Sequence, residues 1–279
     1  IRKVIKGCSL HTFMDAPFTL DSTFGADFDE GHWLSRLLRE EGDADAEASP
    51  SGLLSWFWFD SLAHMGGTGN ALAAVHAMNR AEGPFDCILG FSQGAAVAAA
   101  YASYLNGSHP PTAWPIQSEG DGDSPTLPAP EPELAQALRA VILVGGFKRP
   151  GIAMGPPGDS LDAGDSASPP AAAAAAADAG SGAASLLPVA SLHITGAGDD
   201  IIPPAMSLRV AAFFQGADSN AATDAGSAEG EHRSTATVQG VPHGHRILTH
   251  PGGHYVPTTK PVRDAIRAFL RDVQAAANA

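Results

Sequence analysis

The sequence is poor in cysteine, and this shortage argues against a secreted protein held together by disulfide bonds. Its two cysteines, Cys8 and Cys87, lie in or beside apolar segments. Free thiols are often buried in such places, so neither cysteine is expected in a disulfide bond. A reducing compartment fits best. We therefore expect a cytoplasmic protein, with the nucleus as a further location.

Positive charge and long apolar runs are also scarce. The chain has 16 Lys and Arg against 30 Asp and Glu, which gives a formal net charge of −14. This charge repels polyphosphate backbones and anionic lipids, and no basic cluster reverses it locally, so nucleic acid is not an expected partner. No apolar run reaches the roughly 18 residues of a transmembrane helix, and no basic segment followed by an apolar one opens the sequence. Neither a membrane span nor a signal peptide is expected, and no pattern predicts an oligomeric state.

The apolar residues that are present, 44% of the chain, fall into segments of two alternating kinds. Apolar runs without polar alternation predict buried strands at 85–91, 139–144 and 189–195, with a shorter strand at 8–13. Apolar residues at helical spacing predict helices at 69–83, 94–105, 206–214 and 262–273, and a short helix is expected at 33–39. Strands that alternate with helices and are buried on both faces predict an α/β fold, in which a mostly parallel, doubly wound sheet carries helices on both faces.

Three tracts rich in Gly, Pro, Ala, Ser and Asp interrupt this order, near 108–132, 155–184 and 216–234. The second contains an unbroken run of alanines, Ala171–Ala177. Such tracts cannot bury enough side chain to offset the entropy of ordering them. The sequence therefore predicts one domain over residues 1–279 with three flexible surface insertions.

A Gly-x-Ser-x-Gly motif, Gly90-Phe91-Ser92-Gln93-Gly94, joins the strand at 85–91 to the helix at 94–105. A strand before and a helix after are typical of the nucleophile elbow of α/β-hydrolases, where a strained turn exposes the serine. Ser92 would lie at a helix N-terminus, whose free N–H groups favour a developing oxyanion. The backbone N–H of Gln93 is the expected donor. The motif alone also arises by chance in a glycine-rich chain, so its context carries the prediction.

An acid and a base are expected to follow such a nucleophile in that order. Asp199 lies in a glycine-rich loop after the strand at 189–195, at the sheet edge where open α/β sheets bind their ligands. We predict Asp199 as the acid, because the chain turns away at Ile202-Pro203 just after it. Asp200 is the alternative acid, and a solvated turn is the alternative for the pair.

His254 is the predicted general base, because it lies just before the last helix and follows two glycines that let the backbone bring its ring to the serine. His250 is expected to be structural. His243 and His245 form a His-x-His pair that suggests a metal ligand set. No Asp, Glu or Cys accompanies them at ligand spacing, so no metal is expected, and no other cofactor is.

Aromatic residues make up only 7% of the chain, yet four of them are consecutive, at 56–59. We predict that Trp56, Phe57 and Trp58, together with Phe91 beside the nucleophile, line an apolar acyl pocket. The alternative is a core cluster, because aromatic side chains bury large areas whether or not a ligand is nearby.

These motifs resemble those of the FSH family of serine hydrolases. The matching stretches are 83–86, 90–96, 142–147, 187–193, 196–207 and 252–254, with the aromatic segment at 56–59. The resemblance implies an α/β-hydrolase fold, a triad of Ser92, Asp199 and His254, and hydrolysis of a small-molecule carboxylic ester or thioester. Family members open with an apolar strand and a loop that supplies a second oxyanion donor. Nothing of that kind precedes Cys8, so the first strand is expected to be missing.

Two other functions fit the same residues. A catalytically silent α/β-hydrolase that binds a ligand or a partner would explain the missing oxyanion segment. An acyltransferase would form the same acyl-enzyme on Ser92 and pass the acyl group to an alcohol or an amine.

Overall fold

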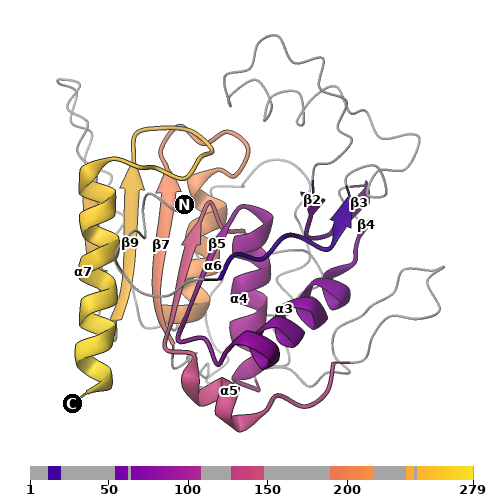
Figure 1. The fold of residues 1–279 in the computed structure, drawn as a ribbon. Helices are drawn as coiled ribbons and strands as arrows, with labels where there is room; N and C mark the ends of the chain where they lie inside the picture. Colours follow the sequence, from indigo (N-terminus) through magenta and orange to yellow (C-terminus); the bar gives the residue numbers. More distant parts are fainter. Residues whose placement is uncertain are drawn as a thin grey trace, which may run out of the picture.

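The computed structural model describes residues 12–19, 54–61, 64–107, 127–147, 189–215, 237–241 and 244–278. Within these residues a five-stranded sheet is flanked by helices, and two further pairs of short antiparallel strands form separate sheets (Figure 1). The elements in chain order are β1 (Phe18–Thr19), β2 (Leu54–Ser55), β3 (Trp58–Ser61), β4 (His64–Gly66), α3 (Thr68–Glu82), β5 (Cys87–Phe91), α4 (Gln93–Leu105), α5 (Pro132–Ala137), β6 (Ala140–Val144), β7 (Ala190–Gly196), α6 (Pro204–Gln215), β8 (Thr237–Val241), β9 (His245–His250) and α7 (Lys260–Ala277).

The strands of the main sheet lie in the order β5-β6-β7-β9-β8. The first four run parallel to one another, and β8 pairs antiparallel with β9. The predicted α/β class with a mostly parallel sheet is therefore confirmed. Because parallel strands end at one edge of a sheet, the loops after β5, β6, β7 and β9 meet at that edge.

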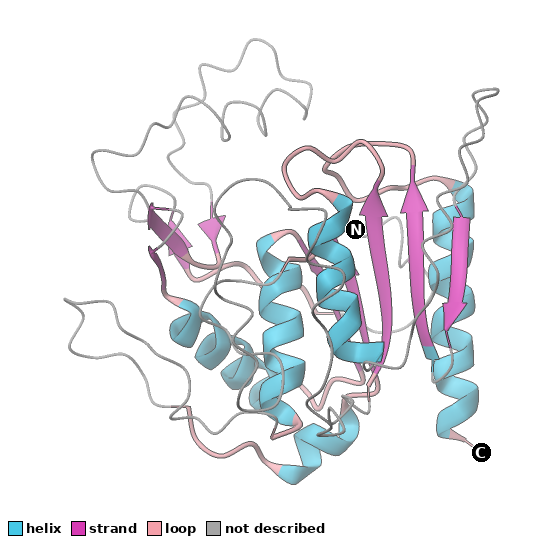
Figure 2. Ribbon diagram, turned by 180° about the vertical axis from the view of Figure 1, so that it is seen from behind, coloured by secondary structure: helices cyan, strands magenta, loops and turns pink. Residues whose placement is uncertain are grey.

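Helices cover both faces of the sheet, as Figures 1 and 2 show from opposite sides. Alternate residues of β6 enter two different cores. Val141 and Leu143 pack in the cluster formed with α3, α4 and α6, whereas Ile142 and Val144 pack with α7. This alternation explains why β6 is apolar throughout, since both of its faces are covered. The doubly wound arrangement is confirmed.

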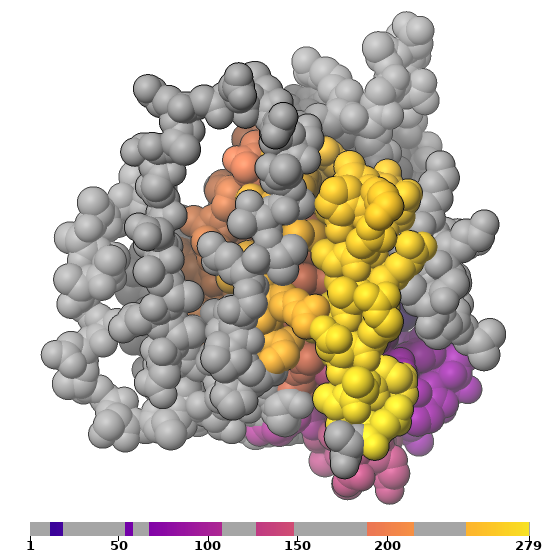
Figure 3. All heavy atoms as spheres, turned by 90° about the vertical axis from the view of Figure 1, so that its left-hand side faces the viewer, coloured from indigo at the N-terminus to yellow at the C-terminus, as the bar shows by residue number. Residues whose placement is uncertain are grey.

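Two of these covering helices, α4 and α7, follow the predicted patterns. On α4 every residue from Ala95 to Leu105 is buried, as expected of a close-packed, alanine-rich helix. On α7 only one stripe is buried, formed by Val262, Ile266 and Phe269, and Figure 3 shows this helix as a continuous column along its side of the molecule. None of the helices in the described ranges has the length and apolar character needed to cross a bilayer.

The structure differs from the sequence predictions at β5. We expected this strand to be buried on both faces, yet only Gly90 is fully buried and its other residues are half-buried. Among the described strands β5 has one neighbour, β6, which accounts for its lower burial. Cys87, on this strand, is half-buried and forms no disulfide bond within the described part of the chain.

The end of the first predicted insertion also differs from expectation. We expected a flexible tract as far as residue 132, but Leu127 is only 5% exposed. The hydroxyl of Tyr104 donates to the carbonyl oxygen of Pro128 at 2.6 Å, and Glu131 pairs with Arg80 at 3.1 Å. One apolar side chain and two polar contacts thus fix 127–131 against α3 and α4. The remainder of this tract, the other two insertions, Cys8 and the helix expected at 33–39 lie outside the described residues, while Thr12 and Phe13 belong to no strand.

A buried polar cluster crosses β7 and β9 on the α6 side. His193 is 2% exposed, and its Nε2 lies 2.9 Å from the hydroxyl of Ser191, which lies 3.0 Å from Nδ1 of His245. The ring of His193 also packs edge-on against Phe214. Burial, and the neighbouring His245 after it, lower the pKa of His193 to about 3. His193 is therefore neutral in the folded protein at neutral pH.

This low pKa predicts an acid-sensitive fold. In the unfolded chain His193 has the ordinary histidine pKa of about 6.5, whereas in the folded protein its pKa is about 3. Between these two pH values the unfolded chain binds a proton and the folded protein does not. The folded protein therefore loses stability as the pH falls from 6.5 toward 3. The cost is about 1.4 kcal/mol per pH unit within this window. We expect urea unfolding between pH 6.5 and 4.5 to show a shallower pH dependence for His193→Gln than for wild type. The two proteins at pH 7 provide the reference, and equal slopes would contradict the prediction.

Candidate active site

The turn between β5 and α4 has the geometry of a nucleophile elbow. Ser92 adopts φ 53° and ψ −120°, a strained conformation for a residue with a side chain. A Cβ on Gly90 would lie 2.2 Å from the carbonyl oxygen of Gly94, so the strand and the helix approach this closely only because Gly90 is a glycine. Ser92 donates its own N–H to Val144 of β6 at 2.9 Å, which fixes the turn to the sheet. The strain and its supports hold the hydroxyl at the carboxyl edge of the strands.

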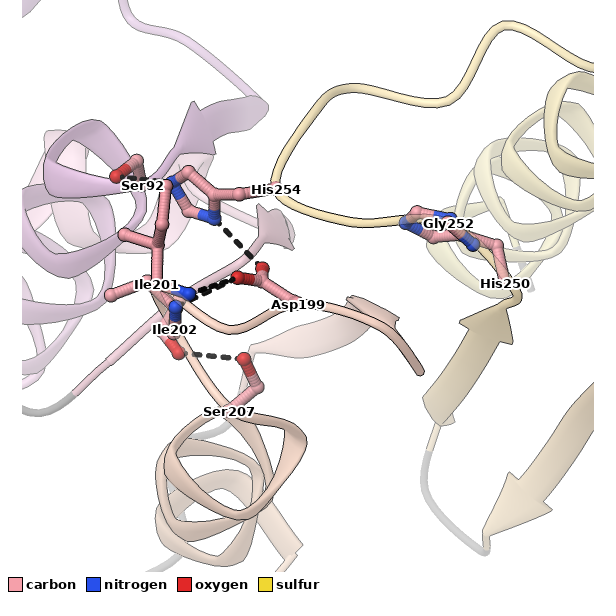
Figure 4. A network of polar contacts seen from close by, with 9 residues as sticks. Ser92, Asp199, Ile201, Ile202, Ser207, His250, Gly252 and His254 are labelled. Carbon is pink, nitrogen blue, oxygen red and sulfur yellow. Dashed lines mark hydrogen bonds and ion pairs between the residues drawn. The ribbon is translucent and has the colours of Figure 1, made fainter. Parts of the chain in front are cut away.

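Three side chains from three loops meet at this edge (Figure 4). Nε2 of His254 lies 2.9 Å from Oγ of Ser92, and Nδ1 of His254 lies 2.7 Å from Oδ2 of Asp199. Because a carboxylate only accepts, Nδ1 carries the hydrogen and Nε2 is free to accept the serine proton. Asp199 and His254 are each 5% exposed, whereas Ser92 is half-buried. The three predicted residues are thus in contact, with the serine toward solvent.

The loop after β7 presents the carboxylate of Asp199 in a fixed orientation. Its Oδ1 accepts hydrogen bonds from the N–H groups of Ile201 and Ile202, at 3.1 and 2.7 Å, which leaves Oδ2 directed at His254 (Figure 4). Asp200, the alternative acid, has an exposed side chain, and the carboxylate that Nδ1 of His254 contacts is that of Asp199. The turn at Ile202 therefore orients the first aspartate rather than the second.

The loop that carries His254 is closely joined to the loop that carries Asp199. A Cβ on Gly196 would lie 2.4 and 2.6 Å from the carbonyl oxygens of Gly252 and Gly253, so only glycine permits this approach. The N–H of Gly198 donates to the carbonyl oxygen of Gly252 at 3.1 Å. The acid and base loops are therefore positioned together.

His250 shapes this loop from within. It is buried, its Nδ1 accepts the N–H of Gly252 at 3.2 Å, and its ring packs against Tyr255. Burial lowers the pKa of His250, although the carboxylate of Asp199 acts in the opposite direction. The neutral ring is the form that can accept from Gly252, which agrees with the structural role expected of His250.

Two residues that support the site, Gly145 and Ser207, were not assigned a role from the sequence. Gly145 follows β6 with φ 56°, and a Cβ there would lie 3.0 Å from Cε1 of His254, so this glycine makes room for the ring. Ser207 of α6 donates its hydroxyl to the carbonyl oxygen of Gly146 at 2.8 Å. The position of Gly145-Gly146, directly after a parallel strand, was the available signal.

The aromatic pocket candidates have different environments. Phe91 is half-buried with its ring 4.9 Å from that of His254, and Trp56 is half-buried beside Gly94. Phe57 is 1% exposed and packs edge-on against Phe147, which places it in the core. The side chain of Trp58 lies outside the described residues. Two of the four candidates are therefore beside the elbow and partly accessible.

The first turn of α4 offers N–H groups beside the serine. Ala95 and Ala96 donate to the carbonyl oxygen of Ser92, whereas the N–H of Gln93 precedes the helical hydrogen-bond ladder.

The described part of the chain contains no group of three or more His, Cys, Asp or Glu side chains placed to hold a metal ion. His245 instead contacts Ser191, and His243 lies outside the described residues.

Comparisons with known proteins find similarity to a serine hydrolase family and to esterases. The model of the serine hydrolase (FSH1) family matches residues 1–233, which include Ser92 and Asp199 but not His254. Esterase OVCA2 of Bos taurus is 29% identical over 204 residues, covering 73% of this chain and 57% of the relative. Esterase OVCA2 of Homo sapiens is 28% identical over 196 residues, covering 70% of this chain and 53% of the relative. The chain thus spans little more than half the length of these relatives.

Two solved structures are also similar to the chain. Acyl-protein thioesterase 2 of Zea mays is 14% identical, with a TM-score of 0.38, over 74% of this chain and 64% of that one. The esterase PE8 is 20% identical, with a TM-score of 0.35, over 74% of this chain and 62% of that one.

Proposed function

The chain belongs to the serine hydrolase (FSH1) family, and from this premise we propose that it hydrolyses carboxylic esters or thioesters through an acyl-enzyme on Ser92. The observation that carries the proposal is the continuous hydrogen-bonded line from Ser92 through His254 to Asp199, with separations of 2.9 and 2.7 Å. A serine hydroxyl becomes a nucleophile only when a positioned base takes its proton, and this arrangement supplies one.

In the proposed acylation step, Oγ of Ser92 attacks the acyl carbonyl carbon while Nε2 of His254 takes its proton. Asp199 stabilises the imidazolium that forms and keeps the hydrogen on Nδ1. The N–H of Gln93, aided by the positive end of the α4 dipole, stabilises the charge on the carbonyl oxygen. His254 then returns the proton to the leaving alcohol or thiol, and the acyl group remains on Ser92.

In the proposed deacylation step, water replaces the leaving group. His254 takes a proton from the water, the hydroxide attacks the acyl-enzyme, and the proton returns to Ser92 as the acid leaves. An alcohol or an amine in place of water would give the acyltransferase outcome. The products should be analysed after reaction with added alcohol. An excess of the acyl-transfer product over the free acid would identify an acyltransferase rather than a hydrolase.

A fluorophosphonate probe together with p-nitrophenyl esters tests the proposed function. The folded protein is expected to be labelled covalently and to release p-nitrophenol with turnover. A folded protein that is neither labelled nor active would contradict the proposal and favour a silent binding protein.

The aromatic side chains beside the elbow lead us to propose an apolar acyl pocket, lined by Trp56 and Phe91. Burying each methylene of an acyl chain in such a pocket raises kcat/KM by up to about fourfold, the equivalent of about 0.8 kcal/mol. We therefore expect kcat/KM to rise from acetyl to octanoyl p-nitrophenyl esters. A flat profile, or one that favours acetyl esters, would contradict the apolar pocket while leaving the esterase proposal standing.

A further inference from the structure

The side chain of Gln93 links the nucleophile elbow to a segment almost forty residues earlier in the chain. Its Oε1 accepts the backbone N–H of Trp56 at 2.9 Å. The same oxygen lies 2.9 Å from the hydroxyl of Ser55, which also lies 2.6 Å from the carbonyl oxygen of Phe57. Because the N–H of Trp56 is a donor, the amide oxygen and not the amide nitrogen must face it. The orientation of the carboxamide is thereby fixed.

The linked segment is short and has anchors on both sides of Trp56. Ser55 is 3% exposed and pairs through β2 with Phe18 of β1. Phe57 is buried against Phe147. Between them the ring of Trp56 is half-buried, and its Nε1 lies 3.2 Å from the position that a Cβ on Gly94 would occupy. Trp56 therefore packs directly over the helix turn that begins at the nucleophile.

We propose that the Gln93 carboxamide is a positioning residue that sets Trp56 against the nucleophile elbow and thereby sets the acyl length that the enzyme accepts. The selectivity part of this proposal rests on the esterase function proposed above. Gln93 then has two roles. Its backbone N–H faces the developing oxyanion, and its side chain holds Trp56, which forms the wall of the acyl pocket. Movement of the wall and placement of the oxyanion donor are coupled through this side chain.

Among the described residues, Oε1 of Gln93 is the acceptor of the Trp56 N–H. Leaving a partly buried backbone N–H without an acceptor costs about 1–3 kcal/mol. The segment around Trp56 avoids this cost by moving until the N–H reaches water. Methionine matches glutamine in length but offers no such acceptor, so Gln93→Met is expected to release the wall. Glutamate keeps an oxygen at this position, so Gln93→Glu is expected to retain it. Both variants keep the backbone N–H of residue 93.

The first measurement is hydrogen exchange of the Trp56 amide by NMR, which requires no activity. In Gln93→Met this amide is expected to exchange at least about tenfold faster than in wild type, as expected for the loss of about 1.4 kcal/mol of protection. In Gln93→Glu the protection should persist. Gln136→Met, at an exposed position of α5, is the matched control and should leave the exchange unchanged. Unchanged exchange in Gln93→Met would overturn the proposal.

The second measurement is the ratio of kcat/KM for octanoyl and acetyl p-nitrophenyl esters. Gln93→Met is expected to lower this ratio by at least about fivefold, as Trp56→Ala should, and the double variant should add little to either change. Gln136→Met, at the exposed position of α5, should leave the ratio unchanged. A wild-type ratio in Gln93→Met would overturn the selectivity. A wild-type protein that hydrolyses no ester would instead contradict the esterase function. Hydrogen exchange of the Trp56 amide would still test whether Gln93 holds Trp56 in place.

Discussion

Ser92→Ala is expected to abolish ester hydrolysis and fluorophosphonate labelling, with kcat falling by about a millionfold, because a nucleophile, its base and its acid act as one unit. Oγ of Ser92 is the atom that faces Nε2 of His254, and alanine removes it without changing the backbone. The variant should fold normally. Ser92 makes no side-chain cap to α4, so its hydroxyl adds little to the stability of the helix.

Ser103→Ala is the matched control for this experiment. Ser103 lies on the same helix, and its buried hydroxyl has no hydrogen-bond partner among the described residues. Removing such a hydroxyl is expected to be neutral or stabilising, with labelling and turnover unchanged. Residual labelling of Ser92→Ala at the wild-type rate would place the reactive nucleophile elsewhere and remove the basis of the proposed function.

The nucleophile elbow could be predicted because its signal is local. A strand, Gly90-Phe91-Ser92-Gln93-Gly94 and a helix follow one another within about twenty residues, and each is set by nearby apolar spacing. The order of acid and base along the chain added Asp199 and His254. The sequence could not establish that these three side chains are in contact, because the contacts join loops that are 55 and 162 residues apart.

The features that the sequence did not reveal are all contacts between distant segments. The position of Gly145 directly after a strand indicates a turn at the sheet edge, but it does not show that this glycine accommodates the ring of His254. The Gln93 side chain could not be assigned a partner, because its acceptor role depends on where Trp56 lies in space. For the same reason the burial of Leu127 was missed in a tract whose composition favours disorder. Composition reports the average of a tract and misses one buried side chain.

Asp199→Asn is the second large effect that we expect, with kcat lowered by about 10⁴-fold. The geometry explains why a nearly isosteric change is so costly. The N–H groups of Ile201 and Ile202 require an acceptor, so the amide oxygen of asparagine would remain on them. Its NH₂ group would then face Nδ1 of His254, which becomes an acceptor and leaves the hydrogen on Nε2. A ring in that tautomer cannot take the proton of Ser92.

Asp200→Asn makes the same chemical change one residue later, which makes it the matched control. Asp200 is exposed, so its substitution is expected to leave kcat for p-nitrophenyl esters close to that of wild type. The kcat of the two variants should be compared at several pH values near neutrality. A wrong tautomer of His254 is expected to lower kcat without displacing the loops. Equal losses in both variants, or a loss confined to Asp200→Asn, would show that the acid is not the carboxylate that His254 contacts. A full loss confined to Asp199→Asn would identify Asp199, whose other oxygen is held by the N–H groups of Ile201 and Ile202, as the carboxylate that serves the histidine.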